Sequence, residues 1–124
     1  MPYQFTWTKK SVCAKLTGVV SLEEALAVNL EFQSHQYFDR LNDFIFDATE
    51  VERFDFDEKH ADTPAIYDKG ASLSNANIKG AFVVKNEQVR GVLKRYLKTS
   101  AQLNTCWKLN LFHSVNDAKE WLSA

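Results

Sequence analysis

The sequence of 124 residues has only two cysteines, four glycines and two prolines, and it has no long hydrophobic run. Two cysteines cannot build a disulfide scaffold. The glycines stand singly, which excludes the Gly-rich phosphate loops of P-loop and dinucleotide-binding proteins. No stretch approaches the roughly 18–20 apolar residues of a membrane span, and residues 1–10 lack the apolar segment of a secretory signal. We therefore expect a cytoplasmic protein without a transmembrane segment.

An excess of charge of one sign is also missing, because 15 basic side chains face 16 acidic ones and leave a formal net charge of −1. Nucleic-acid binding by counterion release depends on a positive excess, so we expect no nucleic-acid partner. Apolar residues are plentiful, since 45% of the chain is hydrophobic and 13% is aromatic. This composition can bury a core, and the length predicts one domain over residues 1–124.

The first third of the chain carries two clear local patterns. Alternating apolar and polar residues predict a β-hairpin over residues 3–17, ended by Gly18. Ser21 and Glu24 have the spacing of a capping box, which predicts a helix beginning after Ser21. An apolar stripe at helical spacing extends this predicted helix to about Leu41.

The middle of the chain predicts a strand, a connector and a second helix. The apolar run within residues 43–48 is typical of a strand buried on both faces. Residues 49–62 then form an acidic connector, with one helical turn expected near residues 57–61. Thr63 and Pro64 predict a helix start with Thr63 as the N-cap. The inward stripe of this helix is expected to be Ala65, Ile66, Lys69 and Leu73.

The last third predicts a strand over residues 81–84, a helix capped by Asn86 and a final strand over residues 107–111. Ser114 or Asn116 then caps a short terminal helix. The order of elements is β-β-α-β-α-β-α-β-α, which predicts an α/β domain with a mostly parallel sheet opened by an antiparallel hairpin.

No pattern for metal binding or catalysis stands out. The three histidines lie in separate predicted elements, without metal-ligand spacing to one another or to a cysteine. Cys13 and Cys106 fall in segments that read as strands, so we expect two reduced, buried thiols. We therefore expect no metal, no other cofactor and no enzymatic activity.

The order of elements, together with several local patterns, resembles the SpoIIAA-like proteins of the STAS fold, which is related to CRAL-TRIO or SEC14-type domains. The patterns are Gly18 before a capped helix, a strand ending in Asp47, the stretch from Asp68-Lys69 to Asn77-Ile78-Lys79, and Phe112-His113-Ser114 leading to Ala118 and Trp121-Leu122. The resemblance implies one STAS-type domain with a five-stranded, mostly parallel sheet and about four helices.

In anti-sigma-factor antagonists of this fold, the strand matching residues 43–48 is followed by an Asp-Ser pair whose serine is phosphorylated by a partner kinase. The spacing of Asp47 and Asp55 fits that pattern, but Phe56 stands where the serine would be, and Asp57 follows it. Phenylalanine cannot accept phosphate, so we expect no phosphorylation switch at this position.

Two functions remain open from the sequence. The first is a non-catalytic regulatory or interaction module that binds a protein partner or a second copy of itself. The second is a carrier of a small apolar or amphipathic ligand near the carboxyl edge of the sheet, where Phe54 and Phe56 alternate with aspartates. The residues expected at the partner- or ligand-binding site are Asp47, Thr49, Phe54, Asp55, Phe56, Asp57, Thr63 and Tyr67.

Overall fold

A five-stranded sheet runs through the middle of the molecule, with the strand order β1-β2-β3-β4-β5. The computed structural model describes residues 3–124, so Met1 and Pro2 of the predicted domain lie outside the described residues. Only the β1–β2 pair is antiparallel, and the other pairs are parallel, as predicted. The strands are β1 (Tyr3–Trp7), β2 (Ser11–Ser21), β3 (Asp43–Asp55), β4 (Lys79–Val83) and β5 (Lys108–Phe112).

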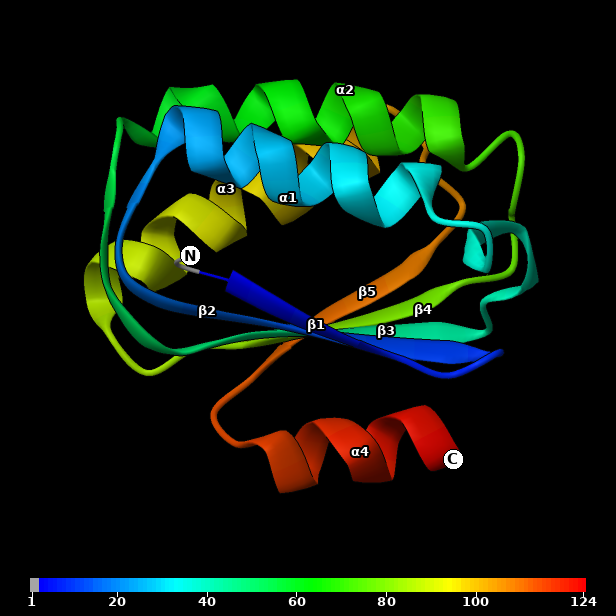
Figure 1. Ribbon diagram of the computed structural model, residues 1–124. Coiled ribbons are helices and arrows are strands. Elements are labelled where there is room, and N and C mark those ends of the chain that lie inside the picture. The colour runs from blue at the N-terminus through cyan, green and yellow to red at the C-terminus, as the bar shows by residue number, and fades with distance from the viewer. Residues whose placement is uncertain (1–2) are drawn as a thin grey trace.

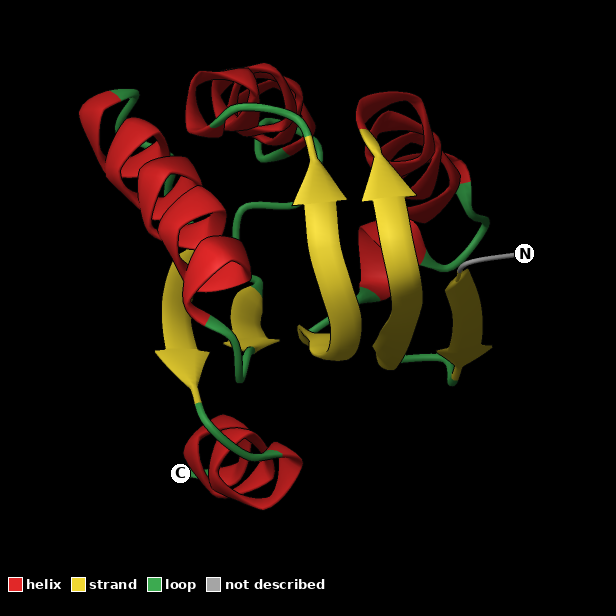
Figure 2. Ribbon diagram, turned by 90° about the vertical axis from the view of Figure 1, so that its left-hand side faces the viewer, coloured by secondary structure: helices red, strands yellow, loops and turns green. Residues whose placement is uncertain are grey.

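Helices cover both faces of this sheet (Figures 1 and 2). Three α-helices lie on one face, where α2 packs between α1 and α3, and α4 lies alone on the other face. No helix within residues 3–124 is both long and apolar enough to cross a membrane. The helices are α1 (Leu22–Ser34), α2 (Asp62–Ala71), α3 (Glu87–Gln102) and α4 (Val115–Ser123), with short 3-10 turns η1 (Phe38–Arg40) and η2 (Glu58–Ala61).

Three of the helix starts follow directly from local side chains. The capping box at α1 is formed in full, because the Glu24 amide donates to Ser21 Oγ at 3.1 Å and the Ser21 amide donates to Glu24 Oε1 at 3.0 Å. The side chains of Asn86 and Ser114 cap α3 and α4 by accepting from the amides of Val89 and Asp117. These predictions are confirmed because a cap depends only on residues within one helical turn.

The predicted hairpin end is wrong, and so is the first part of the predicted acidic connector, whereas the helical turn expected near residues 57–61 is present as η2. Gly18 does not end β2; it has a φ of 72° and lies at a register shift, after which the strand continues to Ser21. The segment over residues 49–55 is not a loop either, since it continues β3 and pairs with this part of β2. We call this paired extension, residues 17–21 with 50–55, the β2–β3 ribbon. It projects beyond β4, which ends at Val83 opposite Asp47.

The first helix is shorter than predicted, because α1 ends at Ser34 instead of Leu41. The chain then forms η1, in which Phe38 is buried, and Leu41 is buried just after it. Asn75, from the other side of the core, donates to the carbonyl oxygens of Phe38 and Leu41 at 2.9 and 3.0 Å. These two tertiary hydrogen bonds hold the segment in a non-helical path that apolar spacing alone does not reveal.

The face that α2 turns inward also differs from the prediction. Ala65 and Asp68 are buried, whereas Ile66 and Leu73 are 57% and 82% exposed. Because Ala65 has a small side chain, α2 can lie close to α1 and α3. The rotation of the helix is set by its polar contacts with α3, described next, more than by its apolar side chains.

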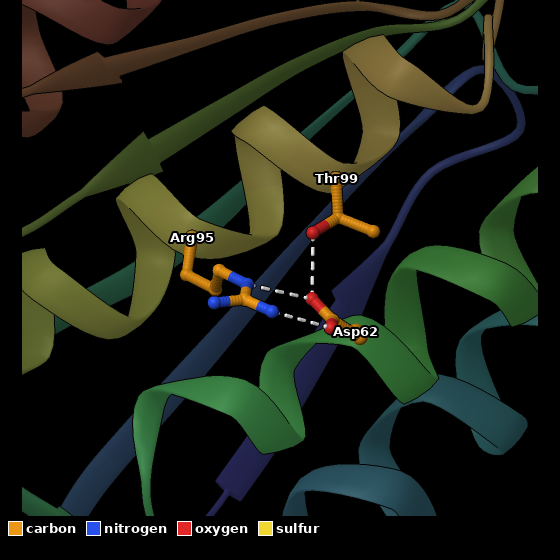
Figure 3. Close-up of polar contacts among 3 residues, drawn as sticks. All are labelled: Asp62, Arg95 and Thr99. Carbon is orange, nitrogen blue, oxygen red and sulfur yellow. Dashed lines mark hydrogen bonds and ion pairs between the residues drawn. The ribbon is translucent and has the colours of Figure 1, made fainter.

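An ion pair fixes the first turn of α2 against α3 (Figure 3). Arg95 donates two hydrogen bonds to the carboxylate of Asp62, at 2.9 and 2.8 Å, and the Thr99 hydroxyl donates a third at 2.6 Å. The bonds from Arg95, and then that from Thr99, lower the pKa of Asp62 to about 2. This bidentate geometry sets the orientation of α2 as well as its position.

The cysteine expectation is wrong for one of the two residues. Cys13 is partly buried in β2, but Cys106 is exposed in the loop before β5. Both are free thiols. The alternation that suggested a strand at Cys106 begins only after Trp107, which is buried and donates its indole N–H to the carbonyl of Asn75 at 2.6 Å.

Two glycines offer a matched test of the packing. A Cβ on Gly80 would lie 2.3 Å from the Phe44 ring and 2.7 Å from Leu109, whereas a Cβ on Gly70 would meet nothing within 4 Å. We expect Gly80→Ala to lower the free energy of unfolding by about 1–3 kcal/mol through overpacking. Gly70→Ala, in α2, should instead raise it by about 0.5–1 kcal/mol. Urea denaturation measures both, and equal stabilities for the two variants would contradict this packing.

Candidate functional site

A cavity of about 90 Å³ lies between the sheet and the three helices on its more heavily covered face. Its walls are mainly apolar and come from β1 to β4, from η2 and from α1, α2 and α3. The aromatic residues that line it are Phe5, Phe32, Phe44, Phe46, Phe54, Phe56, Phe82 and Tyr96. The interior of a chain of this length is mostly filled, and this apolar space remains beneath the helices.

The rim of the cavity lies at the carboxyl edge of β2 and β3. Five lining residues with some solvent exposure come from the start of α1 and from the segment over residues 56–64, and they are Leu22, Ala25, Phe56, His60 and Pro64. Phe5, Asn29 and Phe46 also line the cavity and are partly exposed. Ligands in open α/β sheets bind at this edge, beyond the ends of the strands.

At the inner part of the cavity, three helices meet around one carboxylate. Asp68 of α2 is only 5% exposed. Its Oδ1 accepts a hydrogen bond of 2.6 Å from Nε2 of Gln33 in α1, and its Oδ2 accepts one from the hydroxyl of Tyr96 in α3. The side-chain amide of Asn29, one turn before Gln33, lies beside the same carboxylate. A single acidic side chain thus joins the three helices that cover the sheet.

Burial has the largest effect on the pKa of the Asp68 carboxyl group. Loss of solvent raises the pKa of Asp68 to about 6, and the donors Tyr96, Gln33 and Asn29 offset only part of that rise. No Lys, Arg or His within residues 3–124 forms an ion pair with Asp68. The pKa of Tyr96 is raised well above its ordinary value, first by its own burial and then by the nearby charge of Asp68.

Two polar atoms on cavity-lining residues have no protein partner. Asn29 Oδ1 and His60 Nδ1 are buried, and neither has a hydrogen-bond partner in the described part of the chain. A buried polar group without a partner costs about 1–3 kcal/mol. These atoms are therefore suited to receive a polar group from a bound molecule.

Two of the residues predicted for the site do lie together at the cavity. The rings of Phe54 and Phe56 stack with centroids 5.1 Å apart, and both line the cavity wall. Gln88 of α3 fixes the backbone of Phe54, because it accepts from the Phe54 amide at 2.9 Å and donates to the Phe54 carbonyl at 3.0 Å. Phe54, in the β2–β3 ribbon, and Phe56, just after it, therefore lie against the helices that cover this face of the sheet.

Asp47 and Thr49 form hydrogen bonds with each other. The amide and hydroxyl of Thr49 donate to Asp47 Oδ1 at 3.0 and 2.7 Å, beside the first register shift of the β2–β3 pairing. Neither residue lines the cavity. Their contact stabilises the irregular pairing from which the β2–β3 ribbon starts.

The other predicted residues lie outside the cavity. Asp55 and Asp57 are exposed at the end of the β2–β3 ribbon, on either side of Phe56. Thr63 is not the N-cap of α2, because the helix already begins at Asp62 and Ala61 takes the cap position without a side-chain hydrogen bond. Tyr67 is 51% exposed on the outer side of α2. The predicted set is thus divided between the cavity, its rim and the outer surface.

Sequence reasoning missed the polar residues that line the cavity, which are Asn29, His60, Asp68 and Tyr96, and it missed Gln33, which donates to Asp68. One signal was available for part of this set. Asn29 and Gln33 are one helical turn apart in α1, and Asp68 follows Ala65 by three positions in α2, which are spacings that share a helix face. Without knowing which face turns inward, these residues read as ordinary surface positions.

Large apolar side chains are exposed on the outside of the same helices. Leu30 of α1 is 67% exposed, and Ile66, Tyr67 and Leu73 are 57%, 51% and 82% exposed. Ile66 and the exposed Gly70 are one helical turn apart in α2, and Leu73 lies in the turn just after the helix ends at Ala71. We call Ile66, Tyr67, Gly70 and Leu73 the outer α2 surface.

Within residues 3–124, no three His, Cys, Asp or Glu side chains form a group that could hold a metal ion. The polar cluster of the cavity contains one carboxylate, and its other members are neutral amides and a phenol. The site is therefore built for hydrogen bonding and apolar contact.

The buried carboxylate predicts an unusual dependence of stability on pH. The pKa of Asp68 is about 6 in the folded chain and 3.8 ordinarily, so between these values the folded state holds a proton that the unfolded state has lost. The free energy of unfolding should therefore fall by about 2 kcal/mol as pH rises from 4 to 6.

Asp68→Asn should remove this fall, and the exposed Asp55→Asn should leave it in place. Urea denaturation of the three proteins between pH 4 and 7 measures the difference. Parallel curves for the wild type and Asp68→Asn would show that the carboxyl does not titrate in this range.

Comparison with solved structures places this architecture among known folds. Over 98% of this chain and 96% of the other, it is similar to the anti-sigma factor antagonist SpoIIAA in its unphosphorylated form, with a TM-score of 0.67 and 10% identity. A putative anti-sigma factor antagonist from Thermotoga maritima gives a TM-score of 0.61 at 16% identity, over 98% and 95% of the two chains. An uncharacterised protein with a SpoIIAA-like fold from Shewanella loihica gives 0.53 at 16% identity, over 97% and 91%.

No protein-family model matches the sequence, and no curated protein is a recognisable relative. Identities of 10–16% bear on the fold alone. The chain therefore has the SpoIIAA-like, STAS-type α/β fold that its order of elements predicted.

Proposed function

We propose that the protein is a non-catalytic regulator that acts by binding another protein through the outer α2 surface. The observation that carries this proposal is the exposure of Ile66, Tyr67 and Leu73 on and just after one short helix. Clustered exposed apolar side chains mark interaction sites more often than isolated ones do. Gly70 adds bare backbone to the same surface, which allows a partner to approach closely. The shared fold with two anti-sigma factor antagonists supports a regulatory role.

We further propose that this binding is not switched by phosphorylation at the position after the β2–β3 ribbon. Phe56 occupies the place of the serine in the pattern of anti-sigma-factor antagonists, and its ring is half-buried against Phe54 at the cavity rim. Asp55 and Asp57 on either side would repel an added phosphate. Control of the partner would then depend on another signal.

A second candidate function is favoured by the cavity itself. An apolar space of about 90 Å³ with buried polar atoms at its wall is the expected form of a small-ligand site. In this candidate function the protein carries or senses a small amphipathic molecule beneath α1 and α2. The two functions are compatible, because the cavity lies on the inner side of α2 and the proposed partner surface on its outer side.

The outer α2 surface can be tested by site-specific cross-linking. We expect a photo-cross-linking amino acid in place of Ile66 or Leu73 to capture one defined protein in the cells that produce this chain. The same amino acid in place of Lys94 or Lys98, exposed on α3, serves as the matched control. Equal capture from the α3 positions would contradict the proposal, whereas capture of the chain itself would identify the partner as a second copy.

Once the captured protein is purified, Ile66→Glu and Leu73→Glu should each weaken its binding at least about 10-fold, because a charge would replace apolar contact. Lys98→Glu should leave the affinity within about 2-fold, since the side chain lies on another helix. All three side chains are exposed, so their melting temperatures should match that of the wild type. Isothermal titration calorimetry measures the affinities.

A further inference from the structure

The cavity presents hydrogen-bond acceptors at its inner part. Asp68 already accepts from Gln33 and Tyr96, and the Asn29 amide is a third donor, but a carboxylate has about four lone-pair positions, so about one remains. Asn29 Oδ1, beside it, accepts nothing from residues 3–124. Spare accepting capacity on Asp68 and an unused acceptor on Asn29 therefore lie together in a space lined by apolar side chains. A ligand that fits must bring donors.

The same place carries a negative charge without a counter-charge. The neighbours that contact the Asp68 carboxylate are Asn29 and Gln33 from α1 and Tyr96 from α3, and all of them are neutral. Within the described part of the chain, no basic side chain reaches it in an ion pair. A buried charge is normally paired, because removal from water is costly. A cationic ligand would supply the missing partner.

We propose that this cavity binds a small primary amine in its protonated form. The ammonium group donates to the carboxylate of Asp68 and to Asn29 Oδ1, and a short apolar body lies against Phe54 and Phe56. This inference rests on the second candidate function, the binding of a small ligand in the cavity, and it names the chemical class of that ligand.

Other ligand classes match the site less well. A carboxylate would bring a second negative charge next to Asp68. An alcohol offers one donor and leaves the charge unpaired, whereas an ammonium offers three donors and a positive charge. A quaternary ammonium has the charge but no N–H to satisfy Asn29 Oδ1. Among these classes, only the primary amine combines a positive charge with N–H donors.

The size of the cavity limits the apolar body. A volume of about 90 Å³ is smaller than the ~150 Å³ cavity that accommodates benzene in another protein. The enclosed space is therefore too small for a whole four- or five-carbon amine. The ammonium group and the first carbons lie in it, and the rest of the alkyl body lies at the partly exposed rim beside Phe56. His60 lies in η2, before α2 begins, and it is partly exposed beside the Phe56 ring, so it belongs to the rim and not to the ammonium site.

The test compares butylamine and 3-methylbutylamine with 1-butanol, 3-methylbutan-1-ol and butyrate, using the full chain at neutral pH. Isothermal titration calorimetry gives the affinities, and amide shifts in NMR spectra locate the binding. We expect each amine to bind at least about 10-fold more tightly than the alcohol of the same shape, because only the amine pairs with Asp68. Butyrate should not bind.

Four variants distinguish the contribution of the Asp68 charge to binding from the contribution of the cavity's space. Asp68→Asn should reduce amine affinity at least about 10-fold and leave the weak alcohol affinity unchanged. Asn29→Leu, which keeps Asp68, should reduce amine affinity by a smaller factor and reports on the site even if Asp68→Asn folds poorly. Ala25→Phe, at the rim, should block both ligand classes. Asp55→Asn, exposed outside the cavity, is the matched charge control and should bind like the wild type.

Three results would overturn the inference in different ways. If alcohols bind as tightly as amines and Asp68→Asn changes neither affinity, the cavity is a ligand site but the assignment to amines is wrong. If neither class binds and no cavity resonance shifts, the ligand-binding function fails together with the amine. Amine binding that survives Ala25→Phe would place the amine elsewhere on the protein and would also overturn the inference.

Discussion

The buried carboxylate of Asp68 is the interaction on which the helix layer depends. It accepts hydrogen bonds from Gln33 of α1 and Tyr96 of α3 while it belongs to α2, so one side chain joins all three helices. Asp62 and Arg95 make a second connection between α2 and α3 at the solvent-facing end. Because these bonds are directional, they fix how α2 is rotated, which apolar contact alone would leave less defined.

The β2–β3 ribbon is the second constraint. Register shifts at Lys15–Thr17 and Gly18–Val19 let the two strands continue beyond β4 and bend toward the helices. The ribbon carries Phe54 and Phe56 to the start of α1 and η2, where their stacked rings form part of the cavity wall. The cavity therefore exists because an irregular strand pair reaches over the carboxyl edge of the sheet.

The rotation of α2 divides the protein into an inner and an outer site. Its inner side gives Asp68 to the cavity, and its outer side exposes Ile66, Tyr67 and Leu73. Three solved structures share the fold at 10–16% identity, so the layered arrangement tolerates almost complete replacement of side chains. Function on such a fold depends on the side chains at the site and not on the architecture. Phe56 and Asp68 are the residues from which we infer a particular chemistry here.

The sequence by itself determined whatever depends on neighbours along the chain. The caps at Ser21, Asn86 and Ser114 were predicted because each bonds within one turn, and the order of elements then fixed the parallel sheet and the fold. Only the tertiary structure decided the path of residues 49–55, the end of α1 and the inward face of α2. These features rest on contacts between segments about 30 or more residues apart, such as β2 with β3, Asn75 with Phe38, and Tyr96 with Asp68. Local periodicity contains no information about such partners, and the polar residues of the cavity stayed hidden for that reason.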